Sequence, residues 1–132
     1  MQLRARPTTY RGVAMRSRLE ASVAQYLDEI GFDWDYEPRA YGGTGGQYLP
    51  DFVLYGRGLN RDETHVWEVR PTVEAAFSAL TEMLVIWESE PGWRLCVVIP
   101  GVGLWQNKST FRRPGWRWIA FAEIGVPVGA AA

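Results

Sequence analysis

The sequence YLPDFVL at residues 48–54, followed by VWEVRP at residues 66–71, decides the fold that we predict. Both stretches are apolar and of strand type, and a polar turn segment with Gly, Asn and Asp joins them, which predicts a β-hairpin. Each strand carries one carboxylate, Asp51 in the first and Glu68 in the second. Because side chains alternate along a strand, Glu68 and Arg70 point to the same face. Burying these charges among apolar side chains is costly unless they pair or bind a metal ion.

The composition is that of a globular protein with a substantial core. The chain has 132 residues and a net charge of −1, so it is not a polycation. Its seven Trp, six Tyr and five Phe provide a large area to bury, which argues against global disorder. The chain has a single cysteine, Cys96, which excludes an intrachain disulfide and a cysteine-based zinc site. It also has a single histidine, and this scarcity of both residue types argues against Ser/His/Asp or Cys/His catalysis. No run of about 18 apolar residues and no signal peptide is present, so we expect a cytoplasmic protein.

The basic residues are unevenly distributed along the chain. Five arginines and no acid precede Glu20. We divide the chain into a basic N-terminal arm over residues 1–15, a single domain over residues 16–124 and a flexible tail over residues 125–132. The arm can contact phosphates, be a solvated terminus or form a first irregular strand, and the sequence leaves these alternatives open.

Secondary-structure signals place the motifs on an alternating set of elements. A capping-box pattern at Ser17 to Glu20 and apolar residues at helical spacing predict a helix over residues 18–30. Alternation predicts a strand over residues 32–37, and Thr72 is a predicted N-cap for a second helix that stops at residues 91–92. The apolar run at 94–100 predicts a strand covered on both faces, and residues 116–121 predict an edge strand. Residues 41–46 are expected to be a mobile flap or a hairpin connection, and residues 101–115 a loop.

This order of elements predicts an α/β fold. One helix, three strands, a second helix and two further strands give a three-layer core with a mixed sheet of about five strands flanked by two helices.

Four residues on these elements, Glu20, Asp51, Glu68 and Arg70, resemble the motif set of the PD-(D/E)XK nuclease superfamily, which implies a restriction-endonuclease-like core. The words YEP at residues 36–38, YLPDF and WEVRP are similar to a subgroup of phage and mobile-element proteins, close to the endonuclease subunit of some bacterial transposition machines. The resemblance covers roughly residues 16–100, and no single one of its short motifs is specific.

The resemblance implies the roles of individual residues. Asp51, Glu68 and the Val69 carbonyl would bind Mg²⁺, or Mn²⁺ in its place, and Glu20 would act directly or through a water. Hard oxygen ligands suit Mg²⁺, which takes few carboxylates and keeps several waters. Arg70 departs from the family, which usually has lysine here; an arginine stays protonated and cannot serve as a base, but it can hold a phosphate. Glu20 as a simple helix cap, and Glu68 with Arg70 as a plain ion pair, are the structural alternatives.

Basic residues outside the motifs are candidates for nucleic-acid contact. They are Arg11, Arg16, Arg18, Lys108, Arg112 and Arg113. The last three lie in a segment that mixes arginine with tryptophan, a composition that can stack on bases or can simply be core. The sequence shows no module that reads base edges, so we expect DNA as the partner, with a further protein supplying the target; a homodimer is also open.

Three functions therefore stand as hypotheses. The first is a metal-dependent DNA endonuclease of phage or mobile-element type. The second is a weakened or inactive nuclease fold that binds DNA or assembles in a transposition or phage complex. The third is an unrelated α/β protein whose acids only cap and pair.

Overall fold

A mixed six-stranded sheet between helices forms the centre of the molecule. The computed structural model describes residues 7–43, 46–55, 63–90, 92–107 and 115–120. The strand order in the sheet is β10-β9-β8-β7-β6-β3, with β7 and β8 parallel and the other neighbours antiparallel. The strands are β3 (Asp33–Tyr36), β6 (Phe52–Tyr55), β7 (His65–Val69), β8 (Arg94–Ile99), β9 (Gly103–Asn107) and β10 (Trp116–Ala120). The predicted α/β class is confirmed, and the sheet has one strand more than predicted.

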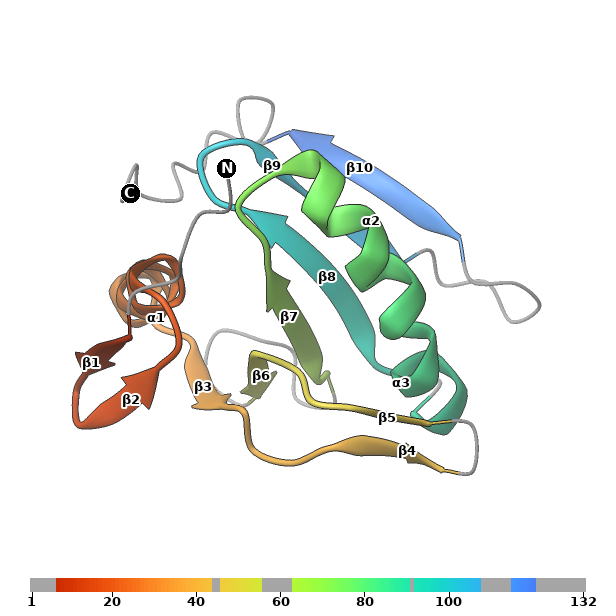
Figure 1. The fold of residues 1–132 in the computed structure, drawn as a ribbon, viewed down its shortest axis with the longest axis horizontal. Helices are drawn as coiled ribbons and strands as arrows, with labels where there is room; N and C mark the ends of the chain where they lie inside the picture. Colours follow the sequence, from red (N-terminus) through yellow and green to blue (C-terminus); the bar gives the residue numbers. More distant parts are fainter. Residues whose placement is uncertain (1–6, 44–45, 56–62, 91, 108–114, 121–132) are drawn as a thin grey trace.

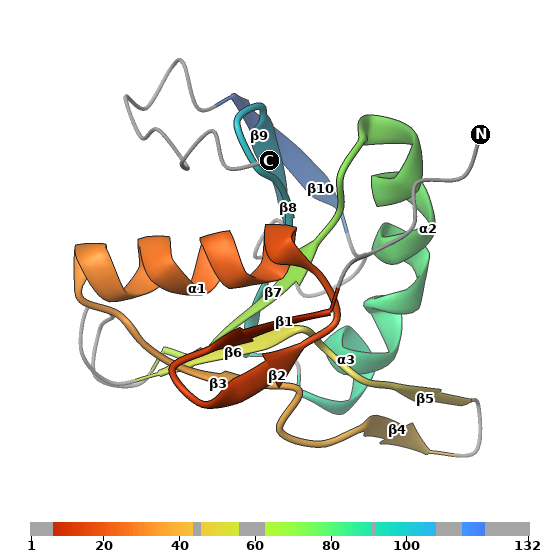
Figure 2. The ribbon, with the colours of Figure 1, turned by 60° about the vertical axis from the view of Figure 1, so that its left-hand side comes forward.

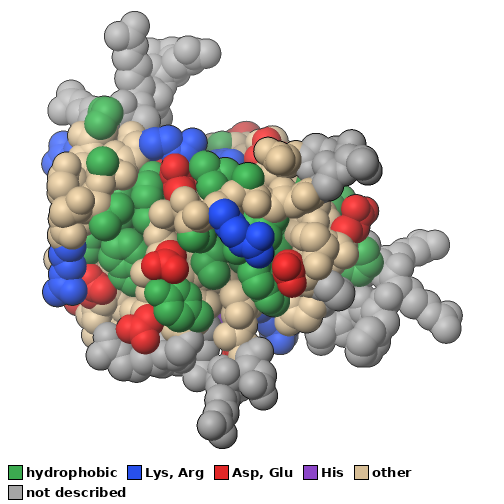
Figure 3. Space-filling view, turned by 90° about the horizontal axis from the view of Figure 1, so that it is seen from below, with side chains coloured by type: hydrophobic (Ala, Val, Ile, Leu, Met, Phe, Trp, Pro, Cys, Tyr) green, Lys and Arg blue, Asp and Glu red, His purple; other side chains and the backbone are tan. Residues whose placement is uncertain are grey.

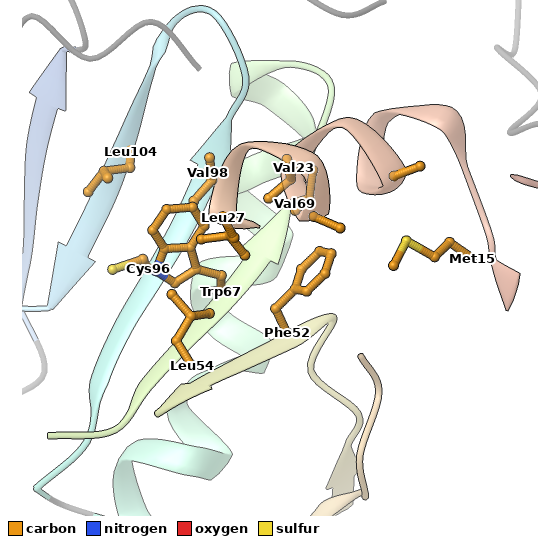
Figure 4. Close-up of a cluster of buried hydrophobic side chains, with 12 residues drawn as sticks. Met15, Val23, Leu27, Phe52, Leu54, Trp67, Val69, Cys96, Val98 and Leu104 are labelled. Atoms are coloured by element: carbon orange, nitrogen blue, oxygen red, sulfur yellow. The ribbon is translucent and has the colours of Figure 1, made fainter. Parts of the chain in front are cut away.

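The helices cover opposite faces of this sheet, as Figures 1 and 2 show. Helix α1 (Arg18–Ile30) lies on one face, and α2 (Val73–Glu82) with α3 (Leu84–Ser89) on the other. Figure 4 shows how α1 meets the sheet: Val23 and Leu27 on the helix face Phe52, Trp67 and Val69 on the strands. The apolar residues of β8 alternate between the two cores, which confirms the prediction of a strand covered on both faces.

The first helix begins and ends where the sequence predicts. The Ser17 side chain caps it by accepting a hydrogen bond from the Glu20 backbone N–H at 3.1 Å. Gly31 ends it in the left-handed conformation, with φ of 85°. This cap fixes the position of Glu20 in the first turn, next to the sheet.

The second helix is interrupted, where the sequence predicts one continuous stretch. Thr72 caps α2 as predicted, accepting from the Ala75 N–H at 3.2 Å. The helix ends at Glu82, and α3 starts after the fully buried Met83. Both helices keep an apolar face on the sheet. The break at Met83 therefore leaves the apolar periodicity of the sequence almost unchanged, and the sequence does not reveal it.

Strand β9 corrects the prediction of a loop over residues 101–115. Its sequence, GLWQN, lacks a clear apolar alternation, since two of its five residues are polar. The Asn107 Oδ1 accepts a hydrogen bond from the Leu95 N–H at 2.8 Å, which makes a polar residue stabilising in this strand. Residues 108–114 of the predicted loop lie outside the described part of the chain. Strand β10 is the predicted edge strand.

A hairpin of β1 (Thr8–Tyr10) and β2 (Val13–Met15) lies against α1. Its two-residue turn has positive φ at Arg11 and at the following glycine, as a tight hairpin turn requires. The Tyr10 hydroxyl donates to Asp28 of α1 at 2.6 Å, and Met15 is only 2% exposed. Residues 8–15 of the predicted N-terminal arm therefore form a hairpin that packs on the domain.

A second hairpin, β4 (Tyr41–Gly43) with β5 (Gly46–Tyr48), packs on α3 (Figure 1). It occupies the glycine-containing stretch predicted as a flap or a connection. Tyr41 and Tyr48 are each 7% exposed and belong to the core beneath α2 and α3. Through Tyr48, this hairpin reaches the region of the buried acids.

The packing of β9 on β10 yields a test of the unexpected strand. A Cβ added at Gly103 would lie 2.5 Å from the Ile119 carbonyl oxygen and 2.7 Å from the Trp118 ring. We expect Gly103→Ala to lower the free energy of unfolding by about 1–3 kcal/mol, as overpacking does. Gly92→Ala, where an added Cβ meets nothing within 4 Å, is the matched control. Equal thermal melting temperatures for the two variants would contradict this account of β9 and β10.

Candidate metal centre

Three predicted site residues, Glu20, Asp51 and Glu68, come together with a further acid, Glu37, where four elements meet at one end of the strands. Glu20 is in the first turn of α1, Glu37 follows β3, Asp51 precedes β6, and Glu68 lies near the carboxyl end of β7. Antiparallel pairing of β3 with β6 brings Glu37 beside Asp51, and the Glu37 N–H donates to the Asp51 carbonyl oxygen at 2.8 Å. Residues far apart in sequence are thereby held by backbone pairing.

Asp51 is the centre of this group and is fully buried, at 0% exposure. Its Oδ2 accepts a hydrogen bond from the Val69 N–H at 2.8 Å, and its Oδ1 accepts from Arg16 Nη2 at 2.9 Å. Its own N–H donates to Glu68 Oε1 at 3.1 Å. The carboxylate is thus oriented by the backbone of β7, while its backbone in turn holds Glu68.

Three acids form a group that can hold a metal ion. Glu20, Glu37 and Asp51 each offer a carboxylate oxygen, and these oxygens all lie within 4.8 Å of one another. Glu37 has a positive φ of 45°, a conformation that a residue with a Cβ adopts at some energetic cost. Carboxylate oxygens suit hard divalent cations such as Mg²⁺ and Mn²⁺.

Arg70 lies among the oxygens that the resemblance assigns to a metal. Its Nη1 forms an ion pair with Glu68 Oε2, donates to the Val69 carbonyl at 3.0 Å and is 3.7 Å from Asp51 Oδ2. Its Nη2 lies 3.5 Å from Glu82 on α2. Asp51 and Glu68 are therefore neighbours on the same side of the sheet, and a guanidinium group bridges them.

A second arginine and a tyrosine complete the network on the α1 side. Arg16 pairs with Glu37 through Nε at 2.7 Å and with Asp51 through Nη2. The Tyr36 hydroxyl donates to Glu20 Oε2 and accepts from the Arg16 N–H at 3.0 Å. The Arg16 side chain is 61% exposed, so it lies at the solvent side of the acids.

Burial is the main cause of the pKa shifts of the acids at this site. Burial raises the pKa of Asp51 to about 8, and the charges of Glu68 and Glu20 act in the same direction. Burial also raises the pKa of Glu68, against the effect of Arg70. Burial alone would lower the pKa of Arg70, but Glu68 and Asp51 raise it above its ordinary value, so this guanidinium stays protonated. A bound cation would stabilise the ionised acids.

The predicted nucleic-acid-binding residues fall into three groups. Arg16 is in the site, whereas Arg11 pairs with Asp28 at 3.4 Å and Arg18 is exposed at the start of α1. Lys108, Arg112 and Arg113 lie outside the described residues. On the face in Figure 3, the coloured acidic and basic side chains are interspersed among hydrophobic ones, without a continuous basic surface.

Comparison with known proteins adds no family assignment. No family model matches the chain, and no curated protein matches it. In the part of the chain that the structure describes, none of the helices has the length and apolar character needed to cross a membrane.

Two site residues were missed as such from the sequence. The sequence places Glu37 in the YEP motif at the end of a strand, but nothing in such a strand ending predicts that its carboxylate lies beside a residue of another strand. Tyr48 belongs to the deciding stretch, but only the structure places it at the site, where burial and the interaction with Glu68 raise the pKa of its hydroxyl.

The raised pKa of Asp51 predicts a pH-dependent stability. Between about pH 4 and pH 8 the folded state keeps a proton that the unfolded chain releases, since the folded pKa is about 8 and the ordinary value is 3.8. The free energy of unfolding should therefore fall as pH rises through this window. We expect Asp51→Asn, which does not titrate, to gain in melting temperature relative to the wild type from about pH 5 to about pH 8.

The measurement is thermal unfolding in a metal chelator across this pH range. Glu88→Gln, which removes an exposed acid on α3, is the matched control and should run parallel to the wild type. A melting-temperature difference between Asp51→Asn and the wild type that stays constant with pH would contradict the prediction.

Proposed function

We propose that this protein is a metal-dependent nuclease that hydrolyses phosphodiester bonds in nucleic acid, with DNA as the expected substrate. The observation that carries the proposal is the convergence of Glu20, Glu37 and Asp51, from three separate elements, on a volume small enough for one ion. The order of elements and the position of the acids at one end of the strands support a restriction-endonuclease-like core. The motif resemblance points to the same chemistry.

A divalent cation in such a site supplies Lewis-acid polarisation of the phosphate and lowers the pKa of a bound water. The chain's own residues supply the rest. Asp51 and its acidic neighbours would hold the ion, and Arg70, which stays protonated, would hold phosphate oxygens and stabilise negative charge. Arg16, at the solvent side, is placed to contact an approaching phosphate.

One observation favours a second candidate, a nuclease fold that binds DNA without cutting it. Arg70 Nη1 already contacts the Glu68 carboxylate, the Val69 carbonyl and Asp51. A cation cannot occupy the same position as this guanidinium. If the reaction required an ion there, the protein would bind its substrate and leave it intact.

Nicking of supercoiled plasmid DNA in Mg²⁺ or Mn²⁺ tests the proposal. We expect the wild type to nick, and Asp51→Ala to lower the rate by about 100-fold or more, because a ligand is lost and Glu68 loses its neighbour. Glu88→Gln should nick like the wild type. Intact plasmid with a shifted gel mobility would favour the binding subunit, and neither nicking nor a shift would contradict both candidates.

Arg70→Lys tests whether the guanidinium group at this position supports nicking better than the ammonium group of the usual lysine would. The guanidinium contacts Glu68 with one nitrogen and Glu82 with the other, which a single ammonium group cannot reproduce. We therefore expect slower nicking by Arg70→Lys under the same conditions. Faster nicking would show that lysine is the better group and that Arg70 weakens the enzyme.

A further inference from the structure

Two sets of oxygen atoms at this site compete for the role of metal ligands. The first consists of Asp51, Glu68 and the Val69 carbonyl, which the motif resemblance implies. The second consists of Glu20, Glu37 and Asp51, whose carboxylate oxygens lie within 4.8 Å of one another. The two sets share Asp51, so an ion can lie on either side of it.

The first set is already filled by a fixed positive charge. Arg70 Nη1 contacts all three members, and Nη2 is anchored from the other side by Glu82 at 3.5 Å. The Arg70 side chain is 22% exposed, so it is largely enclosed. A group held by contacts from β7 and α2 is not easily displaced.

The arginine that closes the second set is more exposed than Arg70. Arg16 pairs with Glu37 and Asp51, but its side chain is 61% exposed. Displacing Arg16 into solvent would uncover two carboxylates beside the third. The exposed arginine can leave, and the enclosed one stays.

The charges of the site balance for one divalent ion. When all four acids are ionised, which a bound cation favours, the carboxylates of Glu20, Glu37, Asp51 and Glu68 face two guanidinium groups, from Arg16 and Arg70. With the exposed Glu82 left aside, the sum is −4 + 2 = −2. One divalent cation neutralises this charge, and a second would leave the site positive before any phosphate arrives.

A buried hydroxyl lies on the Glu68 side of the site. Tyr48 is 7% exposed, and burial together with the interaction with the Glu68 carboxylate raises the pKa of its hydroxyl. Tyr48, like Arg70, therefore interacts with the first set of oxygens.

We propose that the site takes a single divalent cation, held by Glu20, Glu37 and Asp51, and that the Arg70 guanidinium permanently fills the neighbouring position between Asp51, Glu68 and the Val69 carbonyl. Glu37 is then a metal ligand, and Arg16 is a competitor that the ion displaces. The inference rests on the metal requirement of the proposed function, and it deepens that proposal by naming the ligand set and the number of ions.

Direct titration with Mn²⁺ tests this without any substrate. Calorimetry, or the electron paramagnetic resonance signal of free Mn²⁺, gives the number of bound ions and their affinity. We expect one Mn²⁺ per wild-type chain. Glu37→Gln should weaken binding roughly 10- to 100-fold, and Glu68→Gln should weaken it less. Arg16→Gln should tighten binding, because it removes the competing charge, whereas Arg117→Gln on β10 should leave affinity unchanged.

The Arg70→Gln variant gives the sharpest outcome. Removing the guanidinium opens the first ligand set, so the stoichiometry should rise from one Mn²⁺ to two. Glu37→Asn serves as a second variant for the proposed ligand, because asparagine tolerates the positive φ at this position. Circular dichroism melting of each variant shows that it is folded.

Several results would overturn the inference. These are two Mn²⁺ in the wild type, no Mn²⁺ in the folded wild type, a larger loss from Glu68→Gln than from Glu37→Gln, or unchanged stoichiometry in Arg70→Gln. Failure of the proposed function looks different: Mn²⁺ binds with the expected pattern, and plasmid stays intact. Plasmid nicking that survives in Glu37→Gln would leave a nuclease in place and remove only the ligand assignment.

Discussion

The buried carboxylate of Asp51 is the constraint on which the rest of the site depends. A charge at 0% exposure is costly unless polar partners surround it, and here they come from three directions: the Val69 N–H, Arg16 and, through the Asp51 backbone, Glu68. These partners require β6 and β7 to pair in register and α1 to place its first turn beside them. The acid thus couples the geometry of the sheet at this end of the strands to its chemistry.

The same concentration of acids works against the stability of the fold. Burial and the charges of Glu68 and Glu20 raise the pKa of Asp51, and Glu37 keeps a positive φ next to it. Arg16 and Arg70 offset part of the repulsion. A protein selected only for stability would gain by replacing these acids with apolar residues, since a buried ion network is weak evidence of stabilisation. Strain and repulsion kept at one place are typical of a functional site.

Much of this organisation is readable from the sequence, and the exceptions have physical reasons. The caps at Ser17 and Thr72, the motif hairpin and the core strand β8 follow from local patterns that each segment carries by itself. The sequence does not predict strand β9, because its polar residue Asn107 is stabilised by a hydrogen bond from the backbone of a different strand. Glu37 was missed as a site residue because its proximity to Asp51 arises from the register of β3 with β6, and side-chain convergence of this kind is a property of tertiary structure.

The position of the ion is the most direct test of the whole account. A crystal structure of the protein with Mn²⁺, using the anomalous scattering of manganese, locates the metal without any assumption about activity. The account predicts one anomalous peak coordinated by Glu20, Glu37 and Asp51, with Arg70 still between Asp51, Glu68 and the Val69 carbonyl. A peak coordinated by Glu68 and the Val69 carbonyl, or no peak near Asp51, would contradict it.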